Sequence, residues 1–332
     1  MKKITYTIIL LFLLQNFVLS QEHQSIPVST YSIVAYDEET GQLGVAVQSH
    51  WFSVGSLVPW VKAGVGAVAT QSFVKVEYGP NGLKLMEKGF SAEYALKLLV
   101  EDDENRAVRQ VGMVDANGKA DAFTGDNCIQ YAGHIVGKNY AVQANMMASA
   151  TVPTAMVRAY ETTNGELVDK LMAALEAAQK EGGDIRGKQS AAIIVTKGEP
   201  TGIDWKDKLF DLRIEDHHEP IKEMKRLIRV SRAYQHANAG DLFIETGEID
   251  KALEEYTLAA EYYPENPELP FWTAVSLASV NRLEEALPIF VEVFKKAPDL
   301  RDLVTRLIPA GLLPDDEELI KKILEKRENE IK

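Results

Sequence analysis

The first part of the chain alternates apolar residues with polar or small ones at a spacing of two. The alternation runs through residues 30–36 and returns in residues 42–49, with a polar stretch between them. Successive side chains of a β-strand point to opposite faces, so this pattern predicts a β-hairpin. Residues 58–62 and the Gly/Ala/Val-rich run at 63–71 continue the strand signal. We therefore expect three strands within residues 30–78.

Apolar residues at helical spacing come next. Residues 80–88 and 91–100 predict two helices that are separated at Gly89, and Ser91 is suited to cap the second one. The remaining elements are expected as a hairpin at 110–124 with an Asn117-Gly118 turn, strands near 132–136 and 140–144, helices at 152–160 and 165–180, and a strand at 189–196. This order predicts an α+β fold in which two antiparallel sheets lie between helical layers.

The pattern changes after residue 215. Residues 220–235 read as a charged amphipathic helix, and a repeat with a 34-residue period follows it. The matching positions are Ala252 with Ala286, Tyr256 with Phe290, and Pro264 with Pro298. This period and these residue types are typical of tetratricopeptide (TPR) repeats. We therefore expect a small all-α, TPR-like domain with two helix pairs at 236–298, which would serve as a docking or assembly module for a protein partner.

The N-terminus has the layout of an export signal. Residues 1–20 contain two lysines, then an apolar stretch, then Ser20. An uncleaved signal anchor is the alternative interpretation, and no later segment is a transmembrane candidate. The expected organisation is a signal peptide at 1–20, a linker at 21–29, a first domain at 30–215, a connecting helix at 216–235 and the helical domain at 236–332. The mature protein would be periplasmic or extracellular.

Composition narrows the possible partners. The net charge is −13, without basic clusters, which argues against binding to nucleic acid or anionic lipid. Cys128 is the only cysteine, so an intrachain disulfide is impossible, and a buried structural thiol is favoured over a catalytic one. His217 and His218 are adjacent, so their rings tend to point apart rather than share one metal ion. We expect no metal and no cofactor.

Several blocks along the chain resemble one family, the domain of unknown function 1028. The blocks are TYSIVA (30–35), GVAVQS (44–49), VPW (58–60), AGVGAVATQ (63–71), AFTG (122–125), YAVQAN (140–145) and GGDIRGKQSAA (182–192). They occur in the family's order and span roughly residues 30–230. The resemblance implies a four-layer αββα sandwich similar to the N-terminal-nucleophile (Ntn) hydrolases, but it implies no settled activity.

Thr30 is the leading candidate for chemistry, because it opens the first strand about ten residues after the signal ends. If the chain is cut before Thr30, its α-amine, with a usual pKa of about 7.7–8.0, could take the proton of its own hydroxyl. The alternative is that Thr30 simply begins a strand, where β-branched residues are common. Signal cleavage would leave Gln21 first, so a second cut after Ser29 is required. Ser29 and Ser32 are alternative nucleophiles.

Other residues are candidates for catalytic roles beside Thr30. Lys62 stands at a distance from Thr30 that is similar to that of the lysine in proteasome-like Ntn hydrolases, although an exposed strand-end lysine is the alternative. Gln48 and Ser49 stand where such enzymes would have an aspartate. Asn145 could donate an N–H to an oxyanion or cap the end of a strand.

Substrate contacts are expected from Ser32, Ser49 and Arg186. Arg186, near Asp184 and Gln189, could bind a substrate carboxylate or tie a helix end to the next strand. Two functions stay open. One is an exported Ntn-type amidohydrolase that cleaves a small amide or acyl-amino compound. The other is a non-catalytic exported binding or scaffold protein with the same fold. Either could form a homo-oligomer.

Overall fold

The computed structural model describes residues 27–28 and 30–325. The chain divides into two compact units, one ending at Met224 and the other beginning at Lys225. The expected signal peptide and nearly all of the expected linker lie outside the described residues. Within the described part, no helix combines the length and the apolar character that crossing a bilayer requires.

The first unit contains a six-stranded antiparallel sheet around the predicted hairpin. Thr30 lies opposite Ser49 and Tyr36 lies opposite Leu43, which confirms the hairpin. In spatial order the strands are β11 (Lys208–Ile214), β10 (Ser190–Thr196), β3 (Leu43–Ser49), β2 (Thr30–Tyr36), β9 (Tyr140–Ala144) and β8 (Gly133–Gly137). The edge strand β11 was not predicted from the sequence.

A second antiparallel sheet faces the first. Its strands are, in order, β1 (Pro27–Val28), β5 (Gly66–Phe73), β6 (Arg109–Asp115) and β7 (Ala120–Thr124), and β4 (Pro59–Lys62) also pairs with β5. The prediction of three strands within residues 30–78 was therefore wrong by one, because β4 and β5 are separate strands joined by a tight turn with a left-handed Gly64.

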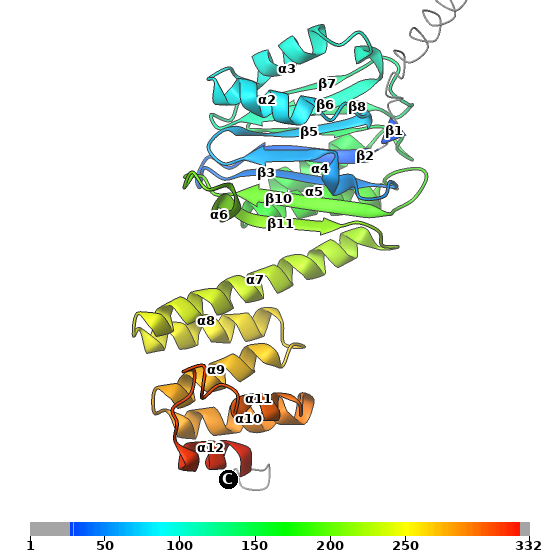
Figure 1. Cartoon of the computed structure of the whole chain (residues 1–332). Helices are drawn as coiled ribbons and strands as arrows, with labels where there is room; N and C mark the ends of the chain where they lie inside the picture. Colours follow the sequence, from blue (N-terminus) through cyan, green and yellow to red (C-terminus); the bar gives the residue numbers. More distant parts are fainter. Residues whose placement is uncertain (1–26, 29, 326–332) are drawn as a thin grey trace, which may run out of the picture. The chain divides into compact units, whose positions relative to one another are not determined.

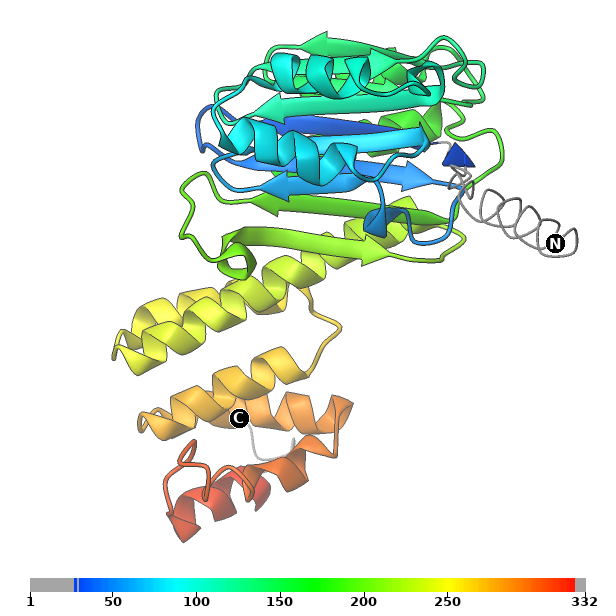
Figure 2. The ribbon, with the colours of Figure 1, turned by 45° about the horizontal axis from the view of Figure 1, so that its top comes forward.

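Helices cover the outer face of each sheet (Figures 1 and 2). Helices α2 (Tyr78–Glu87) and α3 (Ala92–Glu101) pack on the sheet that contains β5, and α4 (Val152–Thr162) and α5 (Leu167–Lys180) pack on the sheet that contains β2. The predicted cap of α3 is present, since Ser91 accepts the Tyr94 N–H at 3.3 Å. The short elements are η1 (Val54–Ser56), η2 (Arg106–Val108) and α6 (Asp204–Asp207). The structure thus confirms an α+β fold with four layers in the order αββα.

The space between the two sheets has an apolar part and a polar part. The apolar part is a cluster of fully buried residues that includes Val34, Val45, Val47 and Ala69. Towards the end where β2 begins, the inward positions become Thr30, Ser32 and Ser49, all fully buried. Burial of the apolar part holds the sheets together, whereas the polar part must satisfy its hydrogen bonds.

In its described residues, up to 325, the second unit contains helices and no strand. Its helices are the C-terminal part of α7 (Pro220–Glu245), α8 (Ile249–Tyr262), α9 (Glu268–Ser279), α10 (Leu283–Lys296), α11 (Leu300–Val304) and α12 (Glu317–Glu325). Helix α7 runs for 26 residues without a break, so the expected boundary between residues 235 and 236 does not coincide with a helix end. Helix α9 packs against both α8 and α10.

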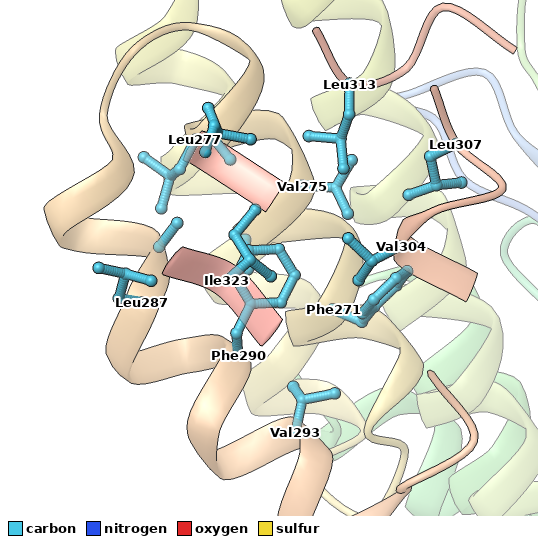
Figure 3. Packing of buried hydrophobic residues seen from close by; sticks show 14 of the residues in the cluster. Phe271, Val275, Leu277, Leu287, Phe290, Val293, Val304, Leu307, Leu313 and Ile323 are labelled. Carbon is cyan, nitrogen blue, oxygen red and sulfur yellow. The ribbon is translucent and has the colours of Figure 1, made fainter. Parts of the chain in front are cut away.

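Aromatic and aliphatic side chains from several helices meet in the core of this unit (Figure 3). The rings of Phe271 and Phe290 meet edge to face, with centroids 5.9 Å apart and planes at 74°. Ala252 and Ala286, the two alanines of the 34-residue period, are both fully buried. The two alanines therefore lie in a packed interior, where there is little space for a larger side chain.

We predict that Ala252→Leu lowers the free energy of unfolding by about 1–3 kcal/mol, because the added carbons have no space in a packed interior. Urea denaturation of the intact protein measures this change. Leu242→Ala on α7 is the control, because Leu242 is 59% exposed. It should change the stability by less than about 0.5 kcal/mol. Equal stability of wild type and Ala252→Leu would contradict the packing.

Candidate active site

Thr30 begins β2 at the polar end of the sandwich. Its side chain is fully buried, and its hydroxyl donates to Ser49 Oγ at 3.2 Å. Asn145, the residue after β9, donates its backbone N–H to the Thr30 carbonyl at 3.0 Å. The structure therefore brings Thr30, Ser49 and Asn145 together on three neighbouring strands. Ser32 lies two residues further along β2, on the same face as Thr30.

The chain changes sheets immediately before Thr30. Pro27 and Val28 pair with Phe73 and Ser72 at the edge of β5, in one sheet. Thr30 opens β2 in the other sheet. In the uncut chain, Thr30 is thus held at a crossing point between the sheets. A cut at this point would place a new N-terminus at the first residue of β2. Ser29, an alternative nucleophile, lies outside the described residues.

A network of glutamine side chains bridges the two sheets next to Thr30. The Ser32 hydroxyl donates to Gln71 Oε1 at 2.6 Å and accepts from Gln143 Nε2 at 2.7 Å. Gln71 Nε2 donates to the Thr30 carbonyl at 3.1 Å and to Gln110 Oε1 at 2.7 Å. Ser32, Gln71, Gln110 and Gln143 are all fully buried. The network therefore links the nucleophile candidate to the opposite sheet.

The network is anchored to backbone groups at its far side. Gln110 Nε2 donates to the carbonyls of Ala144 at 2.9 Å and Gly133 at 3.2 Å, and to Thr124 Oγ1 at 2.9 Å. Asn145 Nδ2 donates to Gln110 Oε1 at 2.9 Å. All side chains in this network are uncharged hydroxyls or carboxamides. Burial among neutral groups disfavours the charged form of an amine, so an α-amine placed here would have a lowered pKa.

The sequence profile of a family of unknown function, DUF1028, matches residues 30–224, which begin at Thr30 and end where the first unit ends. The chain belongs to this family. The crystal structure of a DUF1028 protein from Silicibacter pomeroyi is similar, with a TM-score of 0.55 and 29% identity over 60% of this chain and 85% of that one.

The Anbu (ancestral β-subunit) protein from Yersinia bercovieri aligns with a TM-score of 0.30 and 12% identity, over 59% of this chain and 92% of that chain. No curated protein gives a significant match.

Lys62 does not reach Thr30 in this DUF1028 domain, which corrects the expectation that the two lie together. Lys62 lies opposite Gly66 at the start of β5, whereas Gln71 contacts Thr30 five residues further along the same strand. That separation along β5 is about 16 Å. Lys62 Nζ donates to Glu87 Oε1 at 2.7 Å, and this hydrogen bond raises the pKa of the lysine.

The surroundings of Lys62 form a separate cavity of about 560 Å³. Its walls include Trp60, Leu83 and Lys84. We locate the candidate site at Thr30 rather than in this cavity, because the nucleophile candidate and the buried polar network lie at the other end of the strands. The exposed strand-end interpretation of Lys62 is the one that the structure supports.

Arg186 is held by an acidic neighbour. Its Nε donates to Asp184 Oδ1 at 3.0 Å and its Nη2 donates to Asp184 Oδ2 at 2.7 Å. The Asp184 carboxylate is buried and also receives the His50 N–H at 3.2 Å, next to Ser49. Gln189 donates its backbone N–H to the Ser49 carbonyl at 3.1 Å. The residues after α5 are thus tied to the end of β3, whereas the alternative expected from the sequence was a tie to the next strand along the chain, β10.

Three glutamines, Gln71, Gln110 and Gln143, were missed by the sequence analysis. Each occupies an inward position of a strand that otherwise carries small or apolar inward residues. Gln143 and Asn145 also stand two residues apart, which places them on one face. This two-residue spacing is the sequence feature that could have predicted the polar side chains on the inner face of β9. Gln48, in contrast, lies opposite Tyr31 and therefore on the other face of the sheet from Ser49.

The minor candidates behave as structural groups. The Cys128 thiol donates to the Arg109 carbonyl at 3.3 Å, and burial raises the pKa of this thiol. The rings of His217 and His218 do not point apart as expected from their adjacency, since their centroids lie 4.5 Å apart with the planes tilted by 31°. Among the described residues, no group of three or more histidine, cysteine or acidic side chains is arranged to hold a metal ion.

We predict that Gly112→Ala disrupts the network. A Cβ atom on Gly112 of β6 would lie 2.3 Å from Gln143 Oε1 of β9, and both residues are buried between the two facing sheets. The free energy of unfolding should fall by about 1–3 kcal/mol. Gly133→Ala on β8 is the matched control, since nothing lies within 4 Å of its added carbon. Equal urea midpoints for the two variants would contradict the position of Gln143.

Removal of the Arg186 guanidinium should also be costly. Arg186→Met leaves the buried Asp184 carboxylate without its main partner, and we expect a loss of about 1.5–3 kcal/mol in unfolding free energy. Lys138→Met serves as the control, because the Lys138–Glu38 pair is exposed, with the lysine side chain 77% accessible. That change should stay below about 1 kcal/mol. A larger loss for Lys138→Met than for Arg186→Met in chemical denaturation would refute the assignment.

Proposed function

We propose that this protein is an exported Ntn-type hydrolase that cleaves a small amide or acyl-amino compound through Thr30. The placement of Thr30 carries the proposal, through three features. Thr30 is the first residue of a central strand, it lies in a buried network of neutral groups, and the preceding chain belongs to the other sheet. A single cut before Thr30 would therefore create an amine and a hydroxyl on one residue inside a prepared site.

The chemistry follows from the functional groups. The α-amine takes the proton of Thr30 Oγ1 while the oxygen attacks the substrate carbonyl and forms a tetrahedral intermediate. Collapse breaks the carbon–nitrogen bond, and the leaving amine receives the proton. The acyl group is then an ester on Oγ1. A water molecule, deprotonated by the α-amine, attacks that ester, and the proton returns to Oγ1 as the acid product leaves.

Roles for the neighbouring groups follow the same geometry. Ser49 Oγ already accepts from Thr30 Oγ1 and would continue to orient it. One N–H of the Asn145 carboxamide donates to Gln110, so its second N–H would be the one to donate to an oxyanion. Ser32 is engaged in the network and would act on substrate through it. Asp184 already accepts hydrogen bonds from the Arg186 guanidinium, so a substrate carboxylate would have to share the guanidinium with Asp184.

A second function is supported by the placement of Lys62 and by the burial of Thr30. The lysine of the proteasome-like mechanism is not beside Thr30, and Thr30 is fully buried in the uncut chain. A protein that is never cut at this point would keep the fold without an N-terminal nucleophile. It would then be a non-catalytic exported binding or scaffold protein.

The helical unit is proposed to be a TPR-like docking module for a protein partner. Helix α9 packs between α8 and α10, and a Cβ atom on Gly240 would lie 2.6 Å from the Tyr256 ring. Glycine thus allows α7 and α8 to approach closely, at the repeat position where small residues are expected. The unit has its own hydrophobic core.

N-terminal sequencing of the exported protein tests the proposed hydrolase. We expect the mature chain to begin at Thr30 and to be acylated there by a β-lactone probe, as read by intact mass and peptide mapping. Thr30→Ala should abolish the labelling, and Thr30→Ser should retain it because a hydroxyl remains.

Lys62→Met is the matched control and should be labelled at the wild-type rate, because Lys62 lies at the other end of β5. A mature chain that begins at Gln21 and still hydrolyses an amide at full rate would eliminate the Thr30 mechanism. Absence of any cut and any labelling would favour the binding protein.

A further inference from the structure

The hydrogen bonds of the network have a fixed direction. A backbone carbonyl can only accept, so the two nitrogen atoms that face carbonyls must be donors. Gln71 Nε2 faces the Thr30 carbonyl, and Gln110 Nε2 faces the Ala144 and Gly133 carbonyls. The orientation of both carboxamides is therefore set by the backbone.

The orientation of the Gln110 carboxamide also sets the orientation of the Asn145 carboxamide. With Gln110 Nε2 facing the carbonyls, Gln110 Oε1 must be the acceptor for both Gln71 and Asn145. The Asn145 carboxamide thus turns its nitrogen towards Gln110 and its oxygen away. Asn145 Oδ1 is buried and has no hydrogen-bond partner within the described structure.

A buried acceptor without a partner carries a free-energy cost, and native structures keep few of them. Asn145 lies directly opposite Thr30, because its backbone N–H donates to the Thr30 carbonyl and the β2–β9 register continues to this pair. A cut before Thr30 would add N–H donors at the residue across from this acceptor.

We propose that Asn145 is a positioning residue whose Oδ1 accepts an N–H from the α-amino group of Thr30 after the cut. The inference rests on the proposed function, because it requires Thr30 to become the N-terminus. A neutral amine has two N–H groups and one lone pair. If Asn145 takes one N–H, rotation about the Cα–N bond is restricted, and the lone pair can be directed to Thr30 Oγ1.

The same contact affects the charge of the amine. An acceptor oxygen stabilises the ammonium form more than the neutral form and raises the pKa of the amine. Loss of the acceptor should lower that pKa, and a carboxylate in its place should raise it. Opposite shifts from two substitutions at one position are not expected from a residue with a merely structural role.

The test measures the pKa of the Thr30 α-amine by NMR titration of protein that carries labelled threonine. A protease that leaves no residues behind releases the protein from an N-terminal fusion, so that it begins at Thr30 and catalysis is not needed. Asn145→Asp should raise the pKa by about one pH unit relative to wild type. Asn145→Ala should lower it.

Gln48→Glu is the control for added charge. Gln48 is fully buried, lies one residue from Ser49, and occupies the opposite face of the sheet, so its effect on the amine should be smaller. If Asn145→Asp does not fold, a lowered pKa in Asn145→Ala still supports the proposal, and an unchanged or raised one overturns it. A shift in Gln48→Glu as large as in Asn145→Asp would also overturn it.

Failure of the hydrolase hypothesis is read separately in the same samples. Wild-type protein that is not acylated at Thr30 by the β-lactone probe would contradict the catalytic function, whatever the pKa of its amine. Protein that is acylated, but whose amine pKa does not respond to Asn145, would leave the hydrolase standing and remove the positioning role.

Discussion

Hydrogen-bonding groups buried between two sheets need partners, and this requirement organises the end of the sandwich that holds Thr30. Gln71, Gln110 and Gln143 reach from strands of both sheets and bond to each other, to Ser32 and to backbone carbonyls. Loss of one member would leave the others unsatisfied in a low-dielectric interior. The network therefore fixes the position of Thr30 more firmly than apolar contacts alone would.

The apolar and the polar part of the interior have different structural roles. Valines from both hairpin strands hold the sheets together in the apolar part. In the polar part, hydrogen bonds fix the orientation of the side chains and determine which donor faces which acceptor, which apolar packing does not do. The exposed Lys62–Glu87 pair lies outside this arrangement, and its contribution to stability is small.

Much of the first unit could be predicted from the sequence, because periodicity is strong there. The hairpin at residues 30–49 alternates clearly, and the Asn117-Gly118 turn marks another hairpin. The strand β11 was missed because Lys208, Asp211 and Arg213 give it the look of a polar loop, as is common at a sheet edge.

The site was harder to predict than the fold. Gln71 and Gln110 are separated by 39 residues, so no local pattern joins them. The distance of Lys62 from Thr30 along the chain does not reveal which end of the sheet it occupies. That distinction depends on strand register, and register is set by pairing between segments that are remote in sequence.

The pairing of Pro27 and Val28 with β5 has a consequence for the sheet that they leave. Their partners, Ser72 and Phe73, lie at an edge of β5 that β4 does not reach, since β4 pairs only with residues 66–69. Release of the leading segment would uncover main-chain donors and acceptors beside the new N-terminus. Such an edge can bind an extended peptide by β-augmentation. If the proposed cut before Thr30 occurs, one event would free both the Thr30 amine and this strand edge.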